Sequence, residues 1–413
     1  MSASHISEVE WGDERMDAGE LQTVARATAS LIARHSPIIR PLGGRRGEVI
    51  EHARRRRAFR PPPAGLVADR EPDERDVAAA GRVLAAYAAS RRGAQDASRT
   101  DVWADIRRIQ GNFVALLEGG GAEPLARYLC NVSRHDATIG ITQGDREFKR
   151  IRRDAGYRAF LATMTLDKLV SLAEAVGARP VENPEQGEYG VSMGVEPSLL
   201  ADALAQRLGL DITPPDIDGG LFKLRVGAAR LSERDLGAIY TAHLLRTTLA
   251  DGGRVVEIGG GSGRVAYWSH RMGLTDYTIV DLPLVAAVSG YYLQRALGPA
   301  RVRLQGESSP ADVGVLAHHA LPAADDGRID LVLNQDSIPE MRERDALEYV
   351  DWIAASARRF MSINHESRPV YRRRTLHLSV PELLAGRREF ELELRFPYWL
   401  RKGYVVELYR VAG

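Results

Sequence analysis

The sequence has little of several features that mark particular protein classes. Cys130 is its single cysteine, so the chain has neither a disulfide framework nor a cysteine-rich metal site. No apolar run approaches the length of a membrane span, and the acidic N-terminus lacks the apolar core of a secretion signal. We therefore expect a cytoplasmic protein without a membrane partner.

The chain also has almost no excess of charge. Its 56 basic and 55 acidic side chains give a formal net charge of +1. This balance argues against a dedicated nucleic-acid-binding protein and favours a small molecule as the partner. Lysine is nearly absent, and a GC-rich coding genome explains the preference for arginine. The four lysines are Lys149, Lys168, Lys223 and Lys402.

Glycine, by contrast, is concentrated after one apolar segment. Val255–Ile258 predicts a buried strand, and a helix is expected from Arg264. The turn between them contains Gly259, Gly260, Gly261 and Gly263. Such a turn lets a cofactor approach bare backbone N–H groups at a helix N-terminus. Dinucleotides and S-adenosylmethionine are the two cofactor classes bound in this way.

The dinucleotide pattern G-x-G-x-x-G/A fits the turn in only one register. Counted from Gly259, its last position is Arg264, which fails. Counted from Gly261, the residues Gly263 and Ala266 satisfy the variant that ends in alanine. An NAD(P)-dependent oxidoreductase therefore stays open as the less favoured alternative.

The S-adenosylmethionine pattern fits the turn without adjustment. It consists of an acidic residue on the strand, one spacer and G-x-G-x-G, and Glu257 precedes Gly259, Gly261 and Gly263 at this spacing. A carboxylate at this position offers opposite charge to the ammonium and sulfonium groups of the cofactor. It would repel the pyrophosphate of a dinucleotide. Glu257 therefore favours S-adenosylmethionine.

The second half of the chain predicts alternating strands and helices. Expected helices are Arg264–Met272, Leu284–Leu297 and Met341–Ala357, and expected strands are Tyr277–Asp281, Arg301–Gln305, Ile329–Asn334 and Phe360–Asn364. This alternation indicates an α/β fold with a mostly parallel sheet covered on both faces. Phe390–Phe396 and Tyr404–Val411 predict a closing antiparallel hairpin, which is typical of the Rossmann-like sheet of class I methyltransferases.

Further cofactor contacts are expected around this sheet. They are Asp281, Leu282, Gln305, Gly306, Asn334 and Tyr240. Asp281 ends the second strand about 20 residues after the glycine turn, where an acid binds ribose hydroxyls in such folds; a solvated turn before Pro283 is the alternative. Gln305 and Gly306 are expected near the adenine, and Asn334 at the methionine end. Tyr240 is expected to cover the cofactor from the preceding helix.

Catalytic candidates follow from the chemistry of methyl transfer. A hydroxyl acceptor has a high pKa, so it needs a general base or an acidifying metal. Ligands bind beyond the carboxyl ends of the strands, which selects Asp336, His365 and Glu366. His365 is the preferred base because its ordinary pKa suits neutral pH. His243 is a second candidate, if it faces the cleft.

Two features near these candidates allow other interpretations. Ser337 through Glu340 reads as a helix-starting capping box with a proline, which gives Glu340 a structural role. No spacing in the chain is diagnostic of a metal site, so a divalent metal is an alternative that we do not favour.

The first half of the chain predicts a mainly helical domain. Expected helices are Ala18–Ala33, Glu74–Arg91, Thr100–Leu117, Leu166–Val176, Ser198–Leu208 and Ser232–Leu249, with a short hairpin near Val181–Val195. The basic run Arg45–Arg60 is expected to be a solvated face. Prolines and glycines from Pro214 to Gly220 divide a helical domain, 1–220, from a cofactor-binding domain, 221–413. We expect the helical domain to close the cleft, form the acceptor pocket and mediate dimerisation.

Several motifs of the second half together resemble a known family. They are EIGGGSGRVAY (Glu257–Tyr267), YTIVDLPLV (Tyr277–Val285), YYLQRALG (Tyr291–Gly298), LVLNQDSIPEM (Leu331–Met341) and SINHES (Ser362–Ser367). They are similar to sugar O-methyltransferases of bacterial natural-product and glycan pathways. The resemblance covers Leu221 to the C-terminus and thins upstream.

This resemblance implies the class I fold, S-adenosylmethionine and, more loosely, a sugar hydroxyl as acceptor. Methylation of nitrogen or carbon on a non-sugar metabolite is an alternative on the same fold. A methyltransferase fold kept only for binding is a further alternative, against which the intact Glu257 and Asp281 argue.

Overall fold

The computed structural model describes residues 62–93, 110–135, 141, 143–183, 190–321, 328–366 and 377–412. Pro61–Gly413 form one compact unit, which is the subject of the description below. The predicted helix Ala18–Ala33, the basic run Arg45–Arg60 and the first part of the predicted helix Thr100–Leu117 lie outside the described residues.

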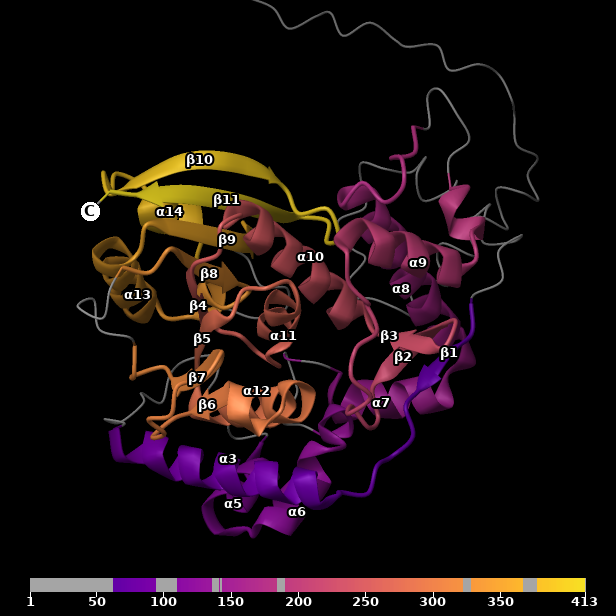
Figure 1. Ribbon diagram of the computed structural model, residues 1–413, viewed down its shortest axis with the longest axis horizontal. Coiled ribbons are helices and arrows are strands. Elements are labelled where there is room, and N and C mark those ends of the chain that lie inside the picture. Colours follow the sequence, from indigo (N-terminus) through magenta and orange to yellow (C-terminus); the bar gives the residue numbers. More distant parts are fainter. Residues whose placement is uncertain are drawn as a thin grey trace, which may run out of the picture. The chain divides into compact units, whose positions relative to one another are not determined.

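An eight-stranded sheet organises the second half of the chain (Figure 1). Its strands lie in the order β10-β11-β9-β8-β4-β5-β7-β6. Their bounds are β4 Arg254–Ile258, β5 Asp276–Asp281, β6 Val302–Leu304, β7 Val313–Ala317, β8 Leu331–Gln335, β9 Arg359–His365, β10 Phe390–Pro397 and β11 Tyr404–Val411. Strands β4 to β9 pair in parallel, whereas β11 pairs antiparallel with both β9 and β10. The predicted class I methyltransferase sheet with its antiparallel hairpin is confirmed.

One strand of this sheet was not expected. The segment predicted as the third strand is present as β6, but it forms the sheet edge. The apolar run of β7 lies between β6 and β5, and pairs with β5 in parallel so that Ala317 faces Asp281 in register. Burial favours this order, because β7 is almost wholly buried while β6 is only a three-residue edge strand. The carboxyl end of β7 therefore lies beside that of β5.

Alternation along β4 directs its side chains to two covered faces. Val256 and Ile258 belong to a core formed with α13 (Glu343–Ser356) and α14 (Val380–Leu384). Glu257 points to the opposite face, because side chains alternate along a strand. Helices α10 (Glu233–Thr248), α11 (Arg264–Arg271) and α12 (Pro283–Leu297) pack together on that face.

The first half of the described chain is mainly helical, as predicted. Its helices are α3 Glu74–Gly93, α5 Gly111–Gly119, α6 Ala122–Leu129, α7 Gly144–Arg153, α8 Ala155–Ala175 and α9 Pro197–Leu208. A small antiparallel sheet joins β1 (Ala64–Leu66), β2 (Phe222–Val226) and β3 (Ala229–Leu231) in the order β1-β2-β3. The hairpin predicted near Val181–Val195 is wrong in its described residues, where Ser192–Gly194 forms a 3-10 turn and no strand.

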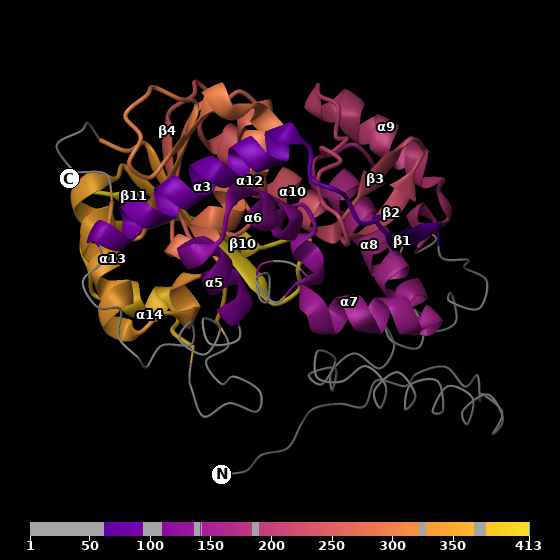
Figure 2. The same cartoon turned by 90° about the horizontal axis from the view of Figure 1, so that it is seen from below.

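Helix α3 packs along α12 and connects the two halves (Figure 2). Asp76 of α3 is fully buried and accepts a 2.6 Å hydrogen bond from the Tyr291 hydroxyl of α12. Arg295 of α12 pairs with the same carboxylate at 2.7 Å. Nearly two turns further along α3, Arg82 binds Glu307, just after β6, at 2.6 Å. These contacts fix α3 beside the β6 edge of the sheet. The predicted division at 220 stays a prediction.

Candidate functional site

The glycine turn connects β4 to α11 with closely packed backbone. Gly259 donates to the Val280 carbonyl at 2.9 Å, and Gly261 donates to Asp281 Oδ2 at 2.9 Å. A β-carbon on Gly260 would lie 2.6 Å from Ile279, and one on Gly259 would collide with Ser337. Ile279 of β5 and Ser337 after β8 therefore leave no room for side chains at the first two glycines. Gly261 has a positive φ of 55°, a conformation that favours glycine, and a β-carbon there would only touch Ile141 at 3.7 Å.

Two buried carboxyl groups flank this turn. Glu257 is 2% exposed and accepts a 3.0 Å hydrogen bond from the Tyr277 hydroxyl. Burial, with a smaller contribution from the charge of Asp281, raises the pKa of Glu257 to about 8. Burial also raises the pKa of Asp281 to about 7, although the N–H groups of Gly261 and Leu282 bind its carboxylate. In the described chain no ion pair joins either group to a cation.

Asn334 forms hydrogen bonds with groups at the ends of three strands. The residue is fully buried, and its amide nitrogen donates to the Ile258 carbonyl at 3.0 Å. Its amide oxygen accepts from the Asn364 side chain at 2.9 Å. These bonds hold the ends of β4, β8 and β9 together, because one residue from each strand takes part. Asn334 thus orders this edge of the sheet, and its contact with the methionine end of the cofactor stays a prediction.

The predicted helix start at Ser337 is also wrong. Ser337 makes no capping bond, and its hydroxyl donates to the Ile258 carbonyl at 2.9 Å. Ile338–Glu340 is a 3-10 turn, termed η6, and α13 begins only at Glu343. The Ser337 side chain therefore binds the strand end before the glycine turn and does not cap a helix.

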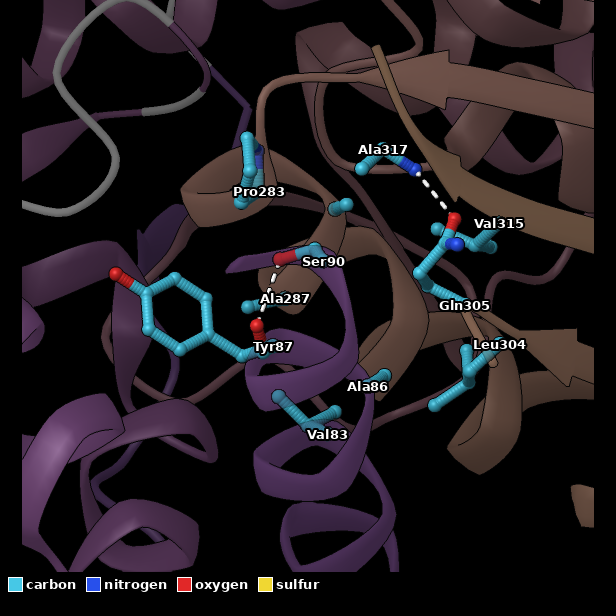
Figure 3. Close-up of a pocket in the computed structure, with 11 residues that line it drawn as sticks. Val83, Ala86, Tyr87, Ser90, Pro283, Ala287, Leu304, Gln305, Val315 and Ala317 are labelled. Atoms are coloured by element: carbon cyan, nitrogen blue, oxygen red, sulfur yellow. Dashed lines mark hydrogen bonds between the residues drawn. The ribbon is translucent and has the colours of Figure 1, made fainter. Parts of the chain in front are cut away.

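A pocket lies beside the β6 edge, close to Asp281 (Figure 3). Gln305 lines it, and its side-chain oxygen accepts from the Ala317 N–H at 3.1 Å. Figure 3 shows Tyr87 and Ser90 of α3 beside Pro283 of α12 in the same pocket. Its other lining residues are Val83, Ala86, Ala286, Ala287, Leu304 and Val315. The predicted adenine region is therefore enclosed partly by α3, which sequence reasoning missed.

Gly306 lies behind this pocket. Its φ is 87°, and a β-carbon there would lie 2.8 Å from that of Ala89 in α3. The glycine allows α3 to approach the β6 edge, so its role here is close packing.

The two candidates on α10 have different surroundings. Tyr240 is 5% exposed and packs on Tyr398 with ring centroids 5.0 Å apart. Thr241 faces the sheet, where its hydroxyl donates to Gln335 at 3.0 Å. His243 comes two residues later and therefore points away from the sheet. Burial and, secondly, Arg207 of α9 lower the pKa of His243. His243 thus lies toward α9 rather than the sheet, and its catalytic role stays a prediction.

Asp336 follows β8 in a strained conformation. It is the one non-glycine residue with positive φ (68°) among those the structure describes. Its N–H donates to Asn364 Oδ1 at 2.9 Å, and Arg401 donates to both of its carboxylate oxygens, at 2.7 and 2.9 Å. The Arg401 guanidinium lies 3.8 Å from the ring centroid of Tyr404. Backbone strain of this kind is found at functional sites.

His365 ends β9 next to Asp336, and Glu366 follows it. The Nε2 of His365 lies 3.0 Å from the Nδ1 of His377. Glu366 instead pairs with Arg395 of β10 at 2.8 Å. The structure therefore gathers Asp336 and His365 at one edge of the sheet, and turns Glu366 toward the hairpin.

Three side chains of this edge were missed by sequence reasoning: His377, Arg401 and Tyr404. Each is brought in by tertiary structure, because β11 pairs with β9 and places Tyr404 opposite His365. The sequence signal was a weak one, namely polar residues in the short connection of the predicted hairpin.

The described residues show neither a metal centre nor a membrane span. They contain no group of three or more histidine, cysteine, aspartate or glutamate side chains arranged to hold a metal ion. None of their helices combines the length and apolar character needed to cross a membrane.

Comparison with known proteins gives structural likenesses only. No family model matches the sequence, and no curated protein matches it. Magnesium protoporphyrin IX methyltransferase from Synechocystis PCC 6803 is 15% identical, with a TM-score of 0.31 over 43% of this chain and 82% of that chain. The glycopeptide N-methyltransferase MtfA with sinefungin is 18% identical, with a TM-score of 0.31 over 43% and 87%.

A third likeness is the N-terminal domain of EvdMO1 with S-adenosylhomocysteine and D-fucose. It is 12% identical, with a TM-score of 0.33 over 46% of this chain and 90% of that chain. At such low identities and scores, the assignment of function depends on the residues of the site itself.

Proposed function

We propose that this chain is an S-adenosylmethionine-dependent methyltransferase that methylates a sugar hydroxyl of a small molecule. The observation that carries the cofactor is the pair of buried carboxyl groups, Glu257 and Asp281, beside the bare backbone of Gly261. Their raised pKa values mean that the site holds unbalanced negative charge when both ionise. A ligand with an ammonium and a sulfonium group supplies the missing positive charge.

The same observation disfavours a dinucleotide. Its pyrophosphate would approach the glycine turn, where Glu257 lies 3.0 Å from the position of a β-carbon on Gly260. Two anionic groups in a buried site repel each other strongly. Arg264, the nearest cation in sequence, is already held by Asp218 and Asp235.

Three groups of residues would each contact a different part of the cofactor. Asp281 would bind the ribose, and the pocket between α3 and Pro283 would hold the adenine. Glu257 and the turn would hold the methionine portion. When bound, the cofactor supplies a methyl group on an electrophilic sulfur. Most of the acceleration then comes from aligning the acceptor with this methyl group.

The acceptor side is assigned to the edge that contains Asp336 and His365. His365 would take the hydroxyl proton, and Asp336, held by Arg401, would orient the acceptor. Ile141 of the helical half lies 3.7 Å from the position of a β-carbon on Gly261, so that half reaches the cofactor turn. The assignment of a sugar as the acceptor depends on the motif resemblance. Methylation of nitrogen or carbon is the alternative.

Calorimetry tests the cofactor, and labelled methyl transfer tests the acceptor. S-adenosylhomocysteine should bind the full chain, whereas NAD⁺ and NADP⁺ should give no heat; the reverse result would contradict the proposal. Transfer of a tritiated methyl group to glycosylated rather than aglycone acceptors would support the sugar. His365→Ala should lower kcat by about 10²- to 10⁴-fold on a hydroxyl acceptor, because it removes the base. Unchanged kcat would favour an amine acceptor.

A further inference from the structure

Two imidazole rings are in contact at the carboxyl end of β9. The Nε2 of His365 and the Nδ1 of His377 are 3.0 Å apart, and the ring centroids are 5.0 Å apart. Two ring nitrogens at this distance form a hydrogen bond, so one carries a proton and the other accepts it. The tautomers of the two rings are therefore coupled.

His365 is positioned by the sheet, and His377 by the turn η6. His365 is the last residue of β9 and pairs with Tyr404 of β11, whose ring lies edge-on to it at 5.6 Å. His377 precedes Leu378, whose N–H donates to the Pro339 carbonyl at 2.9 Å. The contact between the histidines thus joins the end of β9 to the segment after β8, next to Asp336.

We propose that His365 and His377 act as one proton-accepting unit, a role that rests on the proposed methyltransferase function. An imidazolium that donates to a second imidazole gains a charge-assisted hydrogen bond, so the pair binds its first proton more tightly than a lone histidine does. A second proton would place like charges on two rings in contact, and it binds more weakly. The neutral pair is therefore a stronger proton acceptor than a lone histidine, and it takes up one proton in preference to two.

This property suits the transfer of a methyl group to a hydroxyl. As the acceptor oxygen bonds to the methyl carbon, the carbon–sulfur bond breaks and sulfur keeps its electron pair. The hydroxyl proton passes to His365 and is shared with His377 before it reaches solvent. The second ring thus stabilises the charge that the first ring takes up.

Among the described residues, two of the carboxylates near the pair have arginine partners. The titratable and charged groups around the pair are Tyr404 of β11, Asp336 with Arg401, Glu340 of η6, and Glu366 with Arg395. Because Asp336 and Glu366 each have an arginine partner, the contact between the two rings is expected to dominate their titration.

Nuclear magnetic resonance of the full chain with ¹³Cε1-labelled histidine tests this coupling. In the unmodified protein, the two rings should titrate in two steps, one above and one below the ordinary histidine pKa of about 6.5. His377→Gln should leave His365 with a single step near the ordinary value. His243→Gln is the matched control, since this histidine lies on α10 away from the site, and it should leave both steps in place.

Two results would overturn the proposal: independent titration of both rings near the ordinary value, or a split that survives His377→Gln. S-adenosylhomocysteine, titrated calorimetrically into the same samples, should bind His377→Gln and the unmodified chain equally. If it bound neither, the methyltransferase assignment would fail, while the titration would still decide whether the histidines are coupled.

Discussion

At the scale of single residues, the negative charge of Glu257 should lower the stability of the unliganded chain and raise its affinity for the cofactor. A carboxyl group whose folded pKa is raised binds its proton more tightly in the folded than in the unfolded chain. The stability that it contributes is present in acid and is lost as the pH rises through about 7 for Asp281 and about 8 for Glu257. The free energy of unfolding of the unliganded chain should therefore fall across this window.

Glu257→Gln should change stability and affinity in opposite directions. At pH 8.5 the variant should unfold at a higher temperature, since it removes a buried charge whose cost is at most about 5 kcal/mol. It should bind S-adenosylhomocysteine about 10- to 100-fold more weakly, because a charge-assisted contact to the ammonium group is lost. Differential scanning calorimetry and binding calorimetry from pH 6 to 8.5 measure both.

The pH dependence supplies the control for Glu257. In the unmodified chain, affinity should rise with pH as the two carboxyl groups ionise, whereas Glu257→Gln should show a smaller rise due to Asp281 alone. Equal pH dependence in both proteins would mean that Glu257 does not face the ligand.

Asp336 combines backbone strain with an ion pair, and two substitutions separate them. Asparagine tolerates the left-handed backbone, whereas alanine pays about 1–2 kcal/mol for it. Asp336→Ala should therefore be less stable than Asp336→Asn in urea unfolding, although both lose the salt bridge to Arg401. Equal stabilities would show that the positive φ at Asp336 is relaxed in solution.

Sequence reasoning located residues well where a strand end fixes them. Glu257, Asp281, Asp336 and His365 all lie at the edge expected for ligands. The hydrogen bond from Asn334 to the Ile258 carbonyl could not be predicted, because no sequence pattern shows where a buried amide will bond. The orientation of His243 could not be predicted either, since the rotation of a helix relative to the sheet depends on packing.

At the scale of elements, the long apolar strands and helices of the second half were predictable, and the strand order was only partly so. The segments of β4, β5, β8, β9 and the hairpin carry strong apolar patterns. Strand β7 was missed because its short run lies between polar loops, and its place beside β5 follows from burial. Missing β7 also affected the predicted site, because this strand ends next to Asp281.

Helix α3 depends on one buried carboxylate. Asp76→Ala would leave Arg295 of α12 with only the half-exposed Asp73 as its partner and would remove the Asp76 contact of Arg70, at a cost of about 3 kcal/mol. Tyr291→Phe is the matched control, because it removes one hydrogen bond to Asp76 and should cost only about 1 kcal/mol. Urea unfolding distinguishes the two variants.

The same pair of variants tests whether α3 belongs to the adenine pocket. Release of α3 would remove Tyr87 and Ser90 from the pocket, so S-adenosylhomocysteine should bind Asp76→Ala more weakly than Tyr291→Phe. Equal affinities, measured where both variants are folded, would show that α3 does not contribute to the pocket.

At the scale of the whole molecule, the two halves share buried interactions across the predicted boundary at 220. Strand β1 pairs with β2, so a strand from before α3 completes a sheet formed after residue 221. Arg264, the first residue of α11, is 4% exposed and lies between Asp218 at 2.8 Å and Asp235 at 2.5 Å. A cut at this boundary would remove one of the two partners of a buried cation.

Two truncated chains test where the folding unit begins. A chain of residues 61–413 keeps every described contact of the site, and it should unfold cooperatively and bind S-adenosylhomocysteine as the full chain does. A chain of residues 221–413 loses α3 from α12, β1 from β2 and Asp218 from Arg264. It should show no cooperative thermal transition and no binding, because apolar faces and a buried charge become exposed. Binding by the shorter chain with full affinity would instead establish the boundary at 220.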